Sequence, residues 1–254
     1  MMIDTHAHLY LADFDDDRAE LMQRAEEADV KKIYLPNIDS TTSAALLKMA
    51  ADFPGRAVPM MGLHPCSVKE NVAQELQAVH DWLDKHPFAA IGEIGLDYYW
   101  DTTFKTQQQD AFSQQIDWAL AYDLPIVIHA RNALQDCIDL VRSKQNGRLK
   151  GIFHCFSGSR EQAEQIAELG FLMGIGGVLT FKKSTLPEVL QSVDLQQLVL
   201  ETDAPYLTPA PHRGKRNESS YIPFIAEKLA EIKGVPLAEV AAITSRNAQA
   251  LFPL

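Results

Sequence analysis

The sequence predicts an α/β protein, a single-domain (β/α)8 TIM barrel with eight parallel strands, each followed by a helix. Eight short apolar segments alternate along the chain with helix-like amphipathic segments, which is typical of parallel β/α folds. The length of 254 residues is usual for such a barrel. Unusual polar residues follow most of the apolar segments, and the carboxyl ends of the strands form the active-site face of such a barrel.

The expected strands are short apolar runs bounded by turn residues. They span 2–8, 31–37, 57–63, 89–94, 125–129, 150–155, 170–175 and 197–201. The expected helices span 16–28, 41–52, 72–85, 104–122, 132–145, 159–168, 185–192 and 219–232, with a further helix at 236–252. The alternative is an open doubly wound sheet, which normally carries a glycine-rich turn after its first strand. The stretch LYLADFDDD after the first expected strand contains no glycine, so we favour the barrel.

Composition and charge restrict the function classes. We expect one domain over 1–254, because no long linker or low-complexity segment interrupts the chain. The net charge of −11 argues against a protein that coats nucleic acid, although an enzyme could still bind a few phosphates. There is no apolar run long enough for a membrane span, no secretory signal and no C-x-x-C pair among three cysteines. We therefore expect a cytoplasmic location and no membrane partner, and no obligate protein partner is evident.

The segment IDTHAHLY at residues 3–10 raises the first question about chemistry. Side chains alternate between faces along a strand, so Asp4, His6 and His8 would share one face. Such polar groups are costly to bury without partners. The segment is therefore either a surface strand with a solvated face or one side of a metal site.

Further histidines and acids occupy equivalent places along the chain. Each alone could be an ordinary core, capping or turn residue, but together they would meet at one end of the barrel. They are His6 and His8 after the first strand, His64 after the third, Glu93 at the end of the fourth, His129 and His154 ending the fifth and sixth, and Asp203 after the eighth. His80 and His86 lie in or next to a helix and are expected to be ordinary surface residues. Four histidines and two carboxylates can hold two divalent ions when one carboxylate bridges them.

The chain contains several distinctive motifs, which are MIDTHAHL, GEIGLDYY, HCFSGS, LVLETDAPYLTP and HRGKRN. Together they resemble the TatD family of metal-dependent deoxyribonucleases, and the resemblance runs from residue 2 to the final helix. It implies an amidohydrolase-like barrel and a divalent-metal phosphodiesterase, usually exonucleolytic on DNA. It also implies two divalent ions, magnesium or manganese in preference to zinc.

The resemblance assigns roles to particular residues. One ion would be held by His6, His8, Glu93 and Asp203, and the second by Glu93, His129 and His154, with Glu93 as the bridge. His64 would touch the substrate or the scissile phosphate, which makes Glu93, Asp203 and His64 the expected catalytic residues. The chain departs from the family at Ser219-Ser220, where a proline commonly follows the glutamate. This departure puts the local loop and helix start in doubt.

Basic residues near the same face are candidates for binding phosphate. Arg213, Lys215 and Arg216 follow the eighth strand, and loops near strands seven and eight often bind phosphate in barrels. Arg131 lies two residues after His129. We predict substrate-binding roles for Arg131, Arg213 and Lys215. Lys182 and Lys183 could equally be solvated, and Tyr98, Tyr99 and Trp100 could either stack on a base or pack over the barrel.

Three functional hypotheses remain. The first is a 3′-5′ exodeoxyribonuclease that acts on single-stranded DNA, with RNA as an alternative, through a metal-bound hydroxide. The second is a metal-dependent ester or amide hydrolase, such as an aminoacyl-tRNA deacylase, because fold and metals do not fix the substrate. The third is a non-enzymatic barrel with a structural metal, which the long, carboxylate-rich ligand set disfavours.

Overall fold

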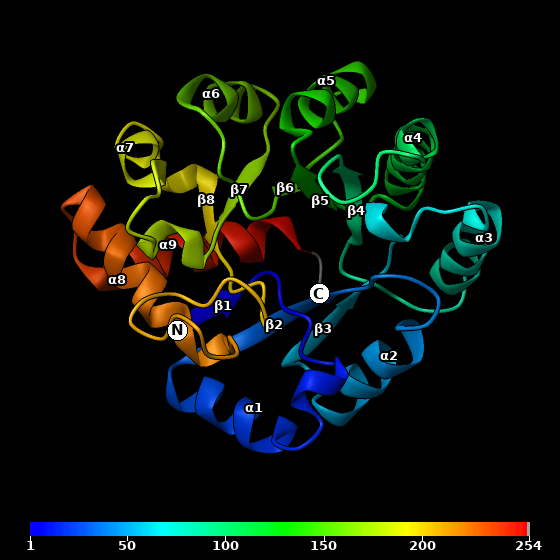
Figure 1. Ribbon diagram of the computed structural model, residues 1–254. Helices are drawn as coiled ribbons and strands as arrows, with labels where there is room; N and C mark the ends of the chain where they lie inside the picture. The colour runs from blue at the N-terminus through cyan, green and yellow to red at the C-terminus, as the bar shows by residue number, and fades with distance from the viewer. Residues whose placement is uncertain (253–254) are drawn as a thin grey trace.

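Eight parallel strands line the inside of the molecule and helices surround them (Figure 1). The computed structural model describes residues 1–252. The strands are β1 (Met2–Asp4), β2 (Val30–Pro36), β3 (Ala57–Met60), β4 (Ile91–Asp97), β5 (Ile126–Arg131), β6 (Gly151–Phe153), β7 (Leu172–Ile175) and β8 (Leu198–Leu200). Each apolar run in the sequence therefore forms a strand, although most strands are shorter than the runs.

Two seams join the strands into a ring. Regular parallel pairing links β1 through β3 and, separately, β4 through β8. A parallel bridge between Met61 and Ile91 joins the two sheets at one seam, and a bridge between Ala7 and Ala204 joins them at the other. At the second seam the amide of Thr5 also donates to the carbonyl of Leu200 over 3.0 Å. The predicted (β/α)8 barrel is confirmed, and only the last two residues of the predicted domain lie outside the described part.

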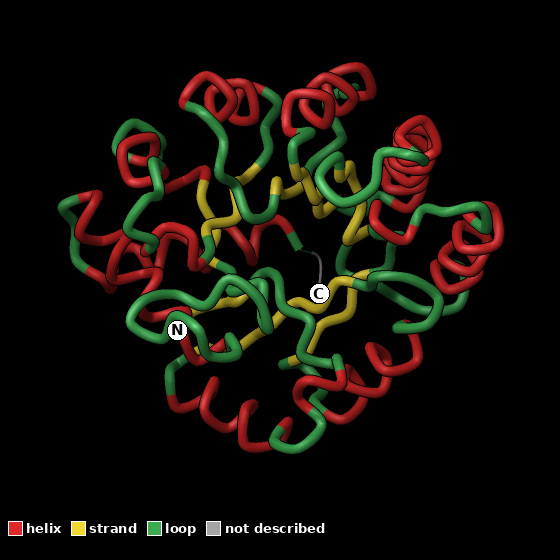
Figure 2. The backbone as a smooth tube through the Cα atoms, in the orientation of Figure 1, coloured by secondary structure: helices red, strands yellow, loops and turns green. Residues whose placement is uncertain are grey.

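Most helices cover the outer side of the strands, whereas the last helix reaches across the amino-terminal end of the barrel (Figure 2). The helices are α1 (Arg18–Glu27), α2 (Ser43–Asp52), α3 (Val72–Leu83), α4 (Lys105–Tyr122), α5 (Leu134–Lys144), α6 (Arg160–Glu168), α7 (Leu186–Leu190), α8 (Ile222–Lys233) and α9 (Leu237–Leu251). Among the described residues, no helix combines the length and apolar character that crossing a membrane requires. The segment predicted as the start of the helix at 219 instead forms a 3-10 turn, Ser219–Tyr221, and α8 begins at Ile222 with Pro223 in its first turn.

The barrel interior is apolar at one end and polar at the other. Val127, Ile152 and Val199 point into the barrel and belong to a buried cluster. The same cluster contains the end of α9 and the following Phe252, whose ring stacks on Tyr34. This cluster fills the amino-terminal end of the barrel. Because side chains alternate along a strand, the residues two positions further on also point inward at the carboxyl end. They are His129, His154 and Glu201.

The face predicted for Asp4 is wrong. The strand β1 ends at Asp4, and its carboxylate accepts a hydrogen bond from the amide of His6 over 3.2 Å, an Asx-type turn that breaks the two-residue alternation. Asp4 points away from the histidines, because its second oxygen accepts from the hydroxyls of Thr202 at 2.6 Å and Ser219 at 2.7 Å. Asp4 therefore joins the first strand to the segments after β8, while His6 and His8 turn toward the barrel axis.

Candidate metal centre

A buried carboxylate lies at the centre of the site. Glu93 is the third residue of β4, so it lies inside this strand rather than at its end as predicted. Its Oε2 atom is 3.1 Å from Nε2 of His6 and 3.4 Å from Nε2 of His8. Its Oε1 atom is 3.0 Å from both Nδ1 of His129 and Nε2 of His154. The two oxygens of one carboxylate thus face two different pairs of histidines.

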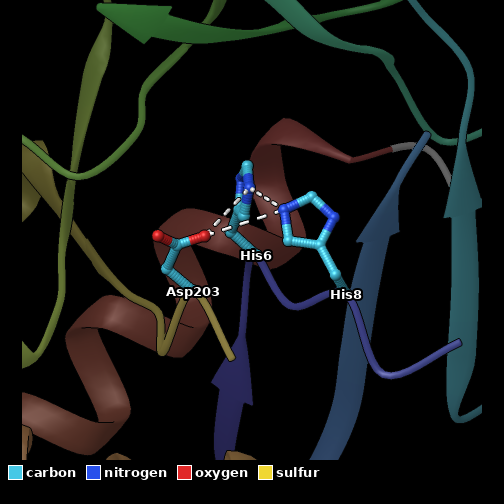
Figure 3. Close-up of side chains that lie close together, drawn as sticks. All are labelled: His6, His8 and Asp203. Atoms are coloured by element: carbon cyan, nitrogen blue, oxygen red, sulfur yellow. Dashed lines mark hydrogen bonds and ion pairs between the residues drawn. The ribbon is translucent and has the colours of Figure 1, made fainter. Parts of the chain in front are cut away.

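Asp203 completes the group around His6 and His8 (Figure 3). Its Oδ1 atom is 3.7 Å from the Nε2 atoms of both histidines. The histidines come from the segment after β1 and Asp203 from the segment after β8, on either side of the second seam. Asp203 has a φ of 59°, a left-handed conformation that aspartate tolerates, and its amide donates to the carbonyl of His6 over 2.9 Å. This hydrogen bond fixes the carboxylate relative to the histidines.

Neighbouring side chains fix the orientation of two of these histidines. Nε2 of His129 lies 2.8 Å from Oδ2 of Asp97, which leaves Nδ1 facing Glu93. Nδ1 of His8 lies 3.0 Å from the hydroxyl of Tyr10, which itself donates to the carbonyl of Pro36. The hydroxyl must therefore accept from Nδ1, and Nε2 of His8 keeps a free lone pair. Partners of this kind commonly set the tautomer of metal-binding histidines.

Glu201 has the same role for His154. Its Oε1 atom is 3.3 Å from Nδ1 of His154 and accepts a 2.5 Å hydrogen bond from the amide of Cys155. A Cβ atom at Gly174 would lie only 2.0 Å from Oε2 of Glu201. Glycine at this position on β7 therefore leaves the space that the buried carboxylate needs.

Sequence reasoning missed Asp97, Glu201 and Tyr10. The positions of Asp97 and Glu201 in the sequence could have indicated that both point into the barrel. Asp97 follows Glu93 by four residues in one strand, so both point to the same face. Glu201 follows the inward-facing Val199 by two residues. Tyr10 carried no such signal, because it follows a stretch in which the alternation has already ended.

His64 lies beside the cluster but presents a different atom. Its Nδ1 atom accepts a 3.0 Å hydrogen bond from the amide of Cys66 in the 3-10 turn Pro65–Ser67. Its Nε2 atom is 3.5 Å from Oε1 of Glu93. Burial lowers the pKa of His64 despite the nearby carboxylate, so the ring is neutral at pH 7. A neutral ring whose Nδ1 accepts must carry its proton on Nε2, and His64 therefore points an N–H toward the site.

The electrostatics of the site favour a bound cation. Burial alone would raise the pKa of Glu93, but His6 and His154 outweigh burial and hold that pKa well below its usual value. Burial lowers the pKa of His6 strongly, which keeps its ring neutral. Burial likewise raises the pKa of Asp203 to about 6. Glu93 and Glu201 outweigh burial and raise the pKa of His154, so metal binding must displace a proton from this ring. Once that proton is lost, imidazole nitrogens around an ionised, buried carboxylate fit divalent ions.

A cavity provides space next to the site. Its volume is about 400 Å³, and it opens between the residues that follow β5 and those that follow β6. Asn132, Gln135, His154 and Cys155 contribute to its lining. A group attached to a reacting centre at the histidine cluster therefore has room beside His154.

The predicted basic residues differ in their surroundings. The guanidinium carbon of Arg131 lies 3.8 Å from the ring centroid of Tyr99, and that of Arg213 lies 3.7 Å from the ring centroid of Phe181. Lys215 is exposed in the segment after β8. Arg216, which the sequence groups with them, instead donates to Asp17 at 2.7 Å. Arg216 is therefore engaged in an ion pair with the segment that precedes α1.

Fold and site together define a metal-dependent hydrolase on a β/α barrel, and comparisons with known proteins identify the family. The family described as TatD related DNase matches residues 3–253. The chain is 37% identical to the uncharacterized metal-dependent hydrolase YabD of Bacillus subtilis, over 99% of both chains. It is 34% identical to the uncharacterized metal-dependent hydrolase TatD of Mycobacterium tuberculosis, over 100% of this chain and 98% of the other. The chain belongs to the TatD family, as its motifs indicated.

A solved structure supports the same assignment. The crystal structure of YjjV, a TatD homologue from Escherichia coli, superposes with a TM-score of 0.93 at 30% sequence identity, covering 100% of this chain and 98% of that one. A TatD family hydrolase from Entamoeba histolytica superposes with a TM-score of 0.84 at 23% identity, covering 99% and 98%, and shows the shared fold.

Proposed function

We propose that the protein is a divalent-metal-dependent phosphodiesterase that degrades single-stranded DNA from its 3′ end, with RNA as an alternative substrate. The main support for this proposal is the position of the Glu93 carboxylate between two pairs of histidines. One of its oxygens faces His6 and His8 and the other faces His129 and His154, the arrangement that a carboxylate needs to bridge two ions. The family description as a DNase supports the choice of nucleic acid as substrate.

The residues divide into two sets of ligands. His6, His8, Glu93 and Asp203 would hold one ion, and Glu93, His129 and His154 would hold the other. Divalent ions in this position neutralise phosphate charge and make bound water more acidic. We propose magnesium or manganese, with zinc as the alternative, because imidazole ligands also suit zinc.

Asp203 and His64 would act directly on the reacting groups. Oδ1 of Asp203 lies 3.7 Å from the Nε2 atoms of both His6 and His8, so its carboxylate is within reach of a water molecule at that ligand set. We assign Asp203 to orient the attacking water and accept its proton. His64 points Nε2–H toward the site and would donate a hydrogen bond to a phosphate oxygen.

Arg131, Arg213 and Lys215 would bind the phosphates of the strand on either side of the reacting one. Arg131 ends β5 and the other two follow β8, so they come from different parts of the barrel rim. The three cysteines are free, and we propose a cytoplasmic location on this basis.

The decisive test uses the variant Glu93→Ala. Chelator-treated protein is given magnesium, manganese or zinc and single-stranded DNA or RNA labelled at either end. We expect metal-dependent shortening from the 3′ end, reduced about a thousand-fold or more in the variant, since the bridge between ions is lost. His80→Ala on α3 is the matched control and should keep full activity.

Two outcomes would count against the proposal. Near-normal cleavage by Glu93→Ala would remove Glu93 from the mechanism. Absence of cleavage with every metal, in protein that still binds metal, would instead favour the ester or amide hydrolase, which a panel of aminoacyl esters and small amides would then test.

A further inference from the structure

Exposed aromatic side chains gather at the metal centre. Among the phenylalanine, tyrosine and tryptophan side chains of residues 1–252, three are exposed, and all follow strands at the active-site end of the barrel. Tyr99 and Trp100 follow β4 and are 52% and 68% exposed, and Tyr206 follows β8 and is 54% exposed. Tryptophan side chains are on average largely buried. The exposure of Trp100 close to the candidate metal centre therefore suggests that it contacts a ligand.

The segment with Tyr99 and Trp100 is fixed to the metal centre through one carboxylate. Oδ1 of Asp97 accepts hydrogen bonds from the amides of Tyr99 at 2.9 Å and Trp100 at 3.1 Å. Oδ2 of the same carboxylate lies 2.8 Å from Nε2 of His129. The carboxylate that orients a candidate metal ligand thus also positions the two aromatic residues.

Arg131 and the two aromatic rings form a single patch, which we call the aromatic patch. The guanidinium carbon of Arg131 lies 3.8 Å from the ring centroid of Tyr99 and 5.0 Å from that of Trp100. The two rings meet edge to face, with centroids 4.8 Å apart and an interplanar angle of 86°. Cation–π contacts hold an arginine in place without using its hydrogen-bond donors, so Arg131 can still contact a phosphate.

The neighbouring tyrosine shows what a packing role looks like in this segment. Lys105 covers the ring of Tyr98, with Nζ 4.1 Å from the centroid. The hydroxyl of Tyr98 donates to Asp136 at 3.1 Å and accepts from Gln109 at 3.0 Å. Tyr98 is therefore held by the helices that follow it, whereas Trp100 leaves most of its surface to solvent.

We propose that the aromatic patch of Tyr99, Trp100 and Arg131 binds a nucleobase of a single-stranded substrate by stacking, next to the phosphate at the metal centre. This inference rests on the proposed nuclease function and deepens it. Every nucleobase has a π face, so stacking is compatible with any sequence. An unpaired base can also unstack from the adjacent bases and stack on the patch instead. The patch thereby favours single strands over duplexes.

Kinetics with Trp100→Ala test the proposal on the metal-loaded enzyme. Two oligonucleotides are compared, one normal and one carrying abasic residues at its three terminal nucleotides. We expect KM for the normal strand to rise about ten-fold in the variant, in line with the usual worth of one stacked base. KM for the abasic strand should be the same in both proteins. Trp100→Phe keeps a stacking ring and should restore most of the affinity.

The control replaces an exposed apolar side chain elsewhere. Leu237 on α9 is 37% exposed, and Leu237→Ala should leave both KM values unchanged. Equal effects of Trp100→Ala on normal and abasic strands, or no effect on either, would overturn the proposal.

A binding measurement separates this inference from the proposed nuclease function. Tryptophan fluorescence of the metal-loaded protein is titrated with deoxyadenosine monophosphate and, separately, with deoxyribose 5-phosphate, neither of which needs to be cleaved. We expect only the nucleotide to quench fluorescence, and Trp100→Phe to abolish the quenching. Fluorescence quenching in a protein that degrades no nucleic acid would support base binding by the aromatic patch and refute the proposed nuclease activity. Cleavage with the same KM for normal and abasic strands would support the nuclease activity and refute base binding by the aromatic patch.

Discussion

His64 differs from the other histidines of the site because its proton lies on Nε2, the ring nitrogen that faces the site. Its Nδ1 is already an acceptor for the amide of Cys66, so Nε2 has no lone pair to offer a metal. We predict that His64→Asn lowers kcat about a hundred-fold or more while the metal content stays that of the wild type. Asparagine suits this test because its side-chain oxygen can accept from Cys66 and preserve the turn.

Metal analysis and steady-state kinetics on the same preparations check this prediction. His154→Ala provides the contrast, since it should lose metal and activity together. Loss of metal from His64→Asn would make His64 a ligand, and the assignment of its tautomer would then be wrong.

At the level of residues, the sequence located the cluster but not its supporting groups. His129 and His154 were predictable because simple alternation places each of them two residues after an inward-facing apolar residue, Val127 and Ile152. Asp4 was assigned to the wrong face because its own side chain ends the alternation by bonding to His6. Asp97 and Glu201 were missed although the same alternation places both on the inner face of the barrel, four residues after Glu93 and two residues after Val199.

At the level of elements, an ion-pair network joins α1 to the segment before α8. Arg24 donates to Glu218 at 2.7 Å and to Asp17 at 2.9 Å, and Arg216 also donates to Asp17 at 2.7 Å. The hydrogen bonds from Arg216 and Arg24 lower the pKa of Asp17 to about 2. A lowered pKa means that this carboxylate stabilises the fold fully above about pH 4 and progressively less as the pH falls toward 2.

We predict that Asp17→Asn costs about 1 kcal/mol of unfolding free energy at pH 7, a value reduced for the partial exposure of the pair. At pH 3 the difference between the two proteins should shrink to roughly half. Urea unfolding of metal-free wild type and variant at both pH values measures it. A difference that does not change with pH would mean that the charge of Asp17 is not its source.

This network also explains a boundary that the sequence could not give. The strands and most helices were predictable, because apolar period and capping residues mark them locally. The start of α8 was not, since Ser219 is held by the distant Asp4 and Glu218 by Arg24. Contacts between residues some two hundred positions apart fixed this segment, and no local pattern reports them.

At the level of the whole molecule, the candidate metal centre lies across the seam between β1 and β8, where the barrel closes. His6 and His8 come from one side of this seam and Asp203 from the other. Only a few backbone hydrogen bonds join the two sides, among them Thr5 to Leu200, His8 to Ala204 and Asp203 to His6. Ions bound by both sides would therefore add a link where the sheet has few of its own.

Metal removal should consequently loosen the seam without unfolding the barrel, because the apolar cluster at the opposite end includes no metal ligand. At a free metal concentration of about a hundred times Kd, binding contributes roughly 2.7 kcal/mol, so we predict a fall in Tm of about 5–10 °C on chelation. Hydrogen exchange should accelerate at the amides of His8 and Asp203 and stay unchanged at Ile33, which donates to Arg56 within the region without ligands. Global unfolding on chelation would instead identify the metal as a structural element, and uniform exchange across the barrel would show that the seam has no special dependence on it.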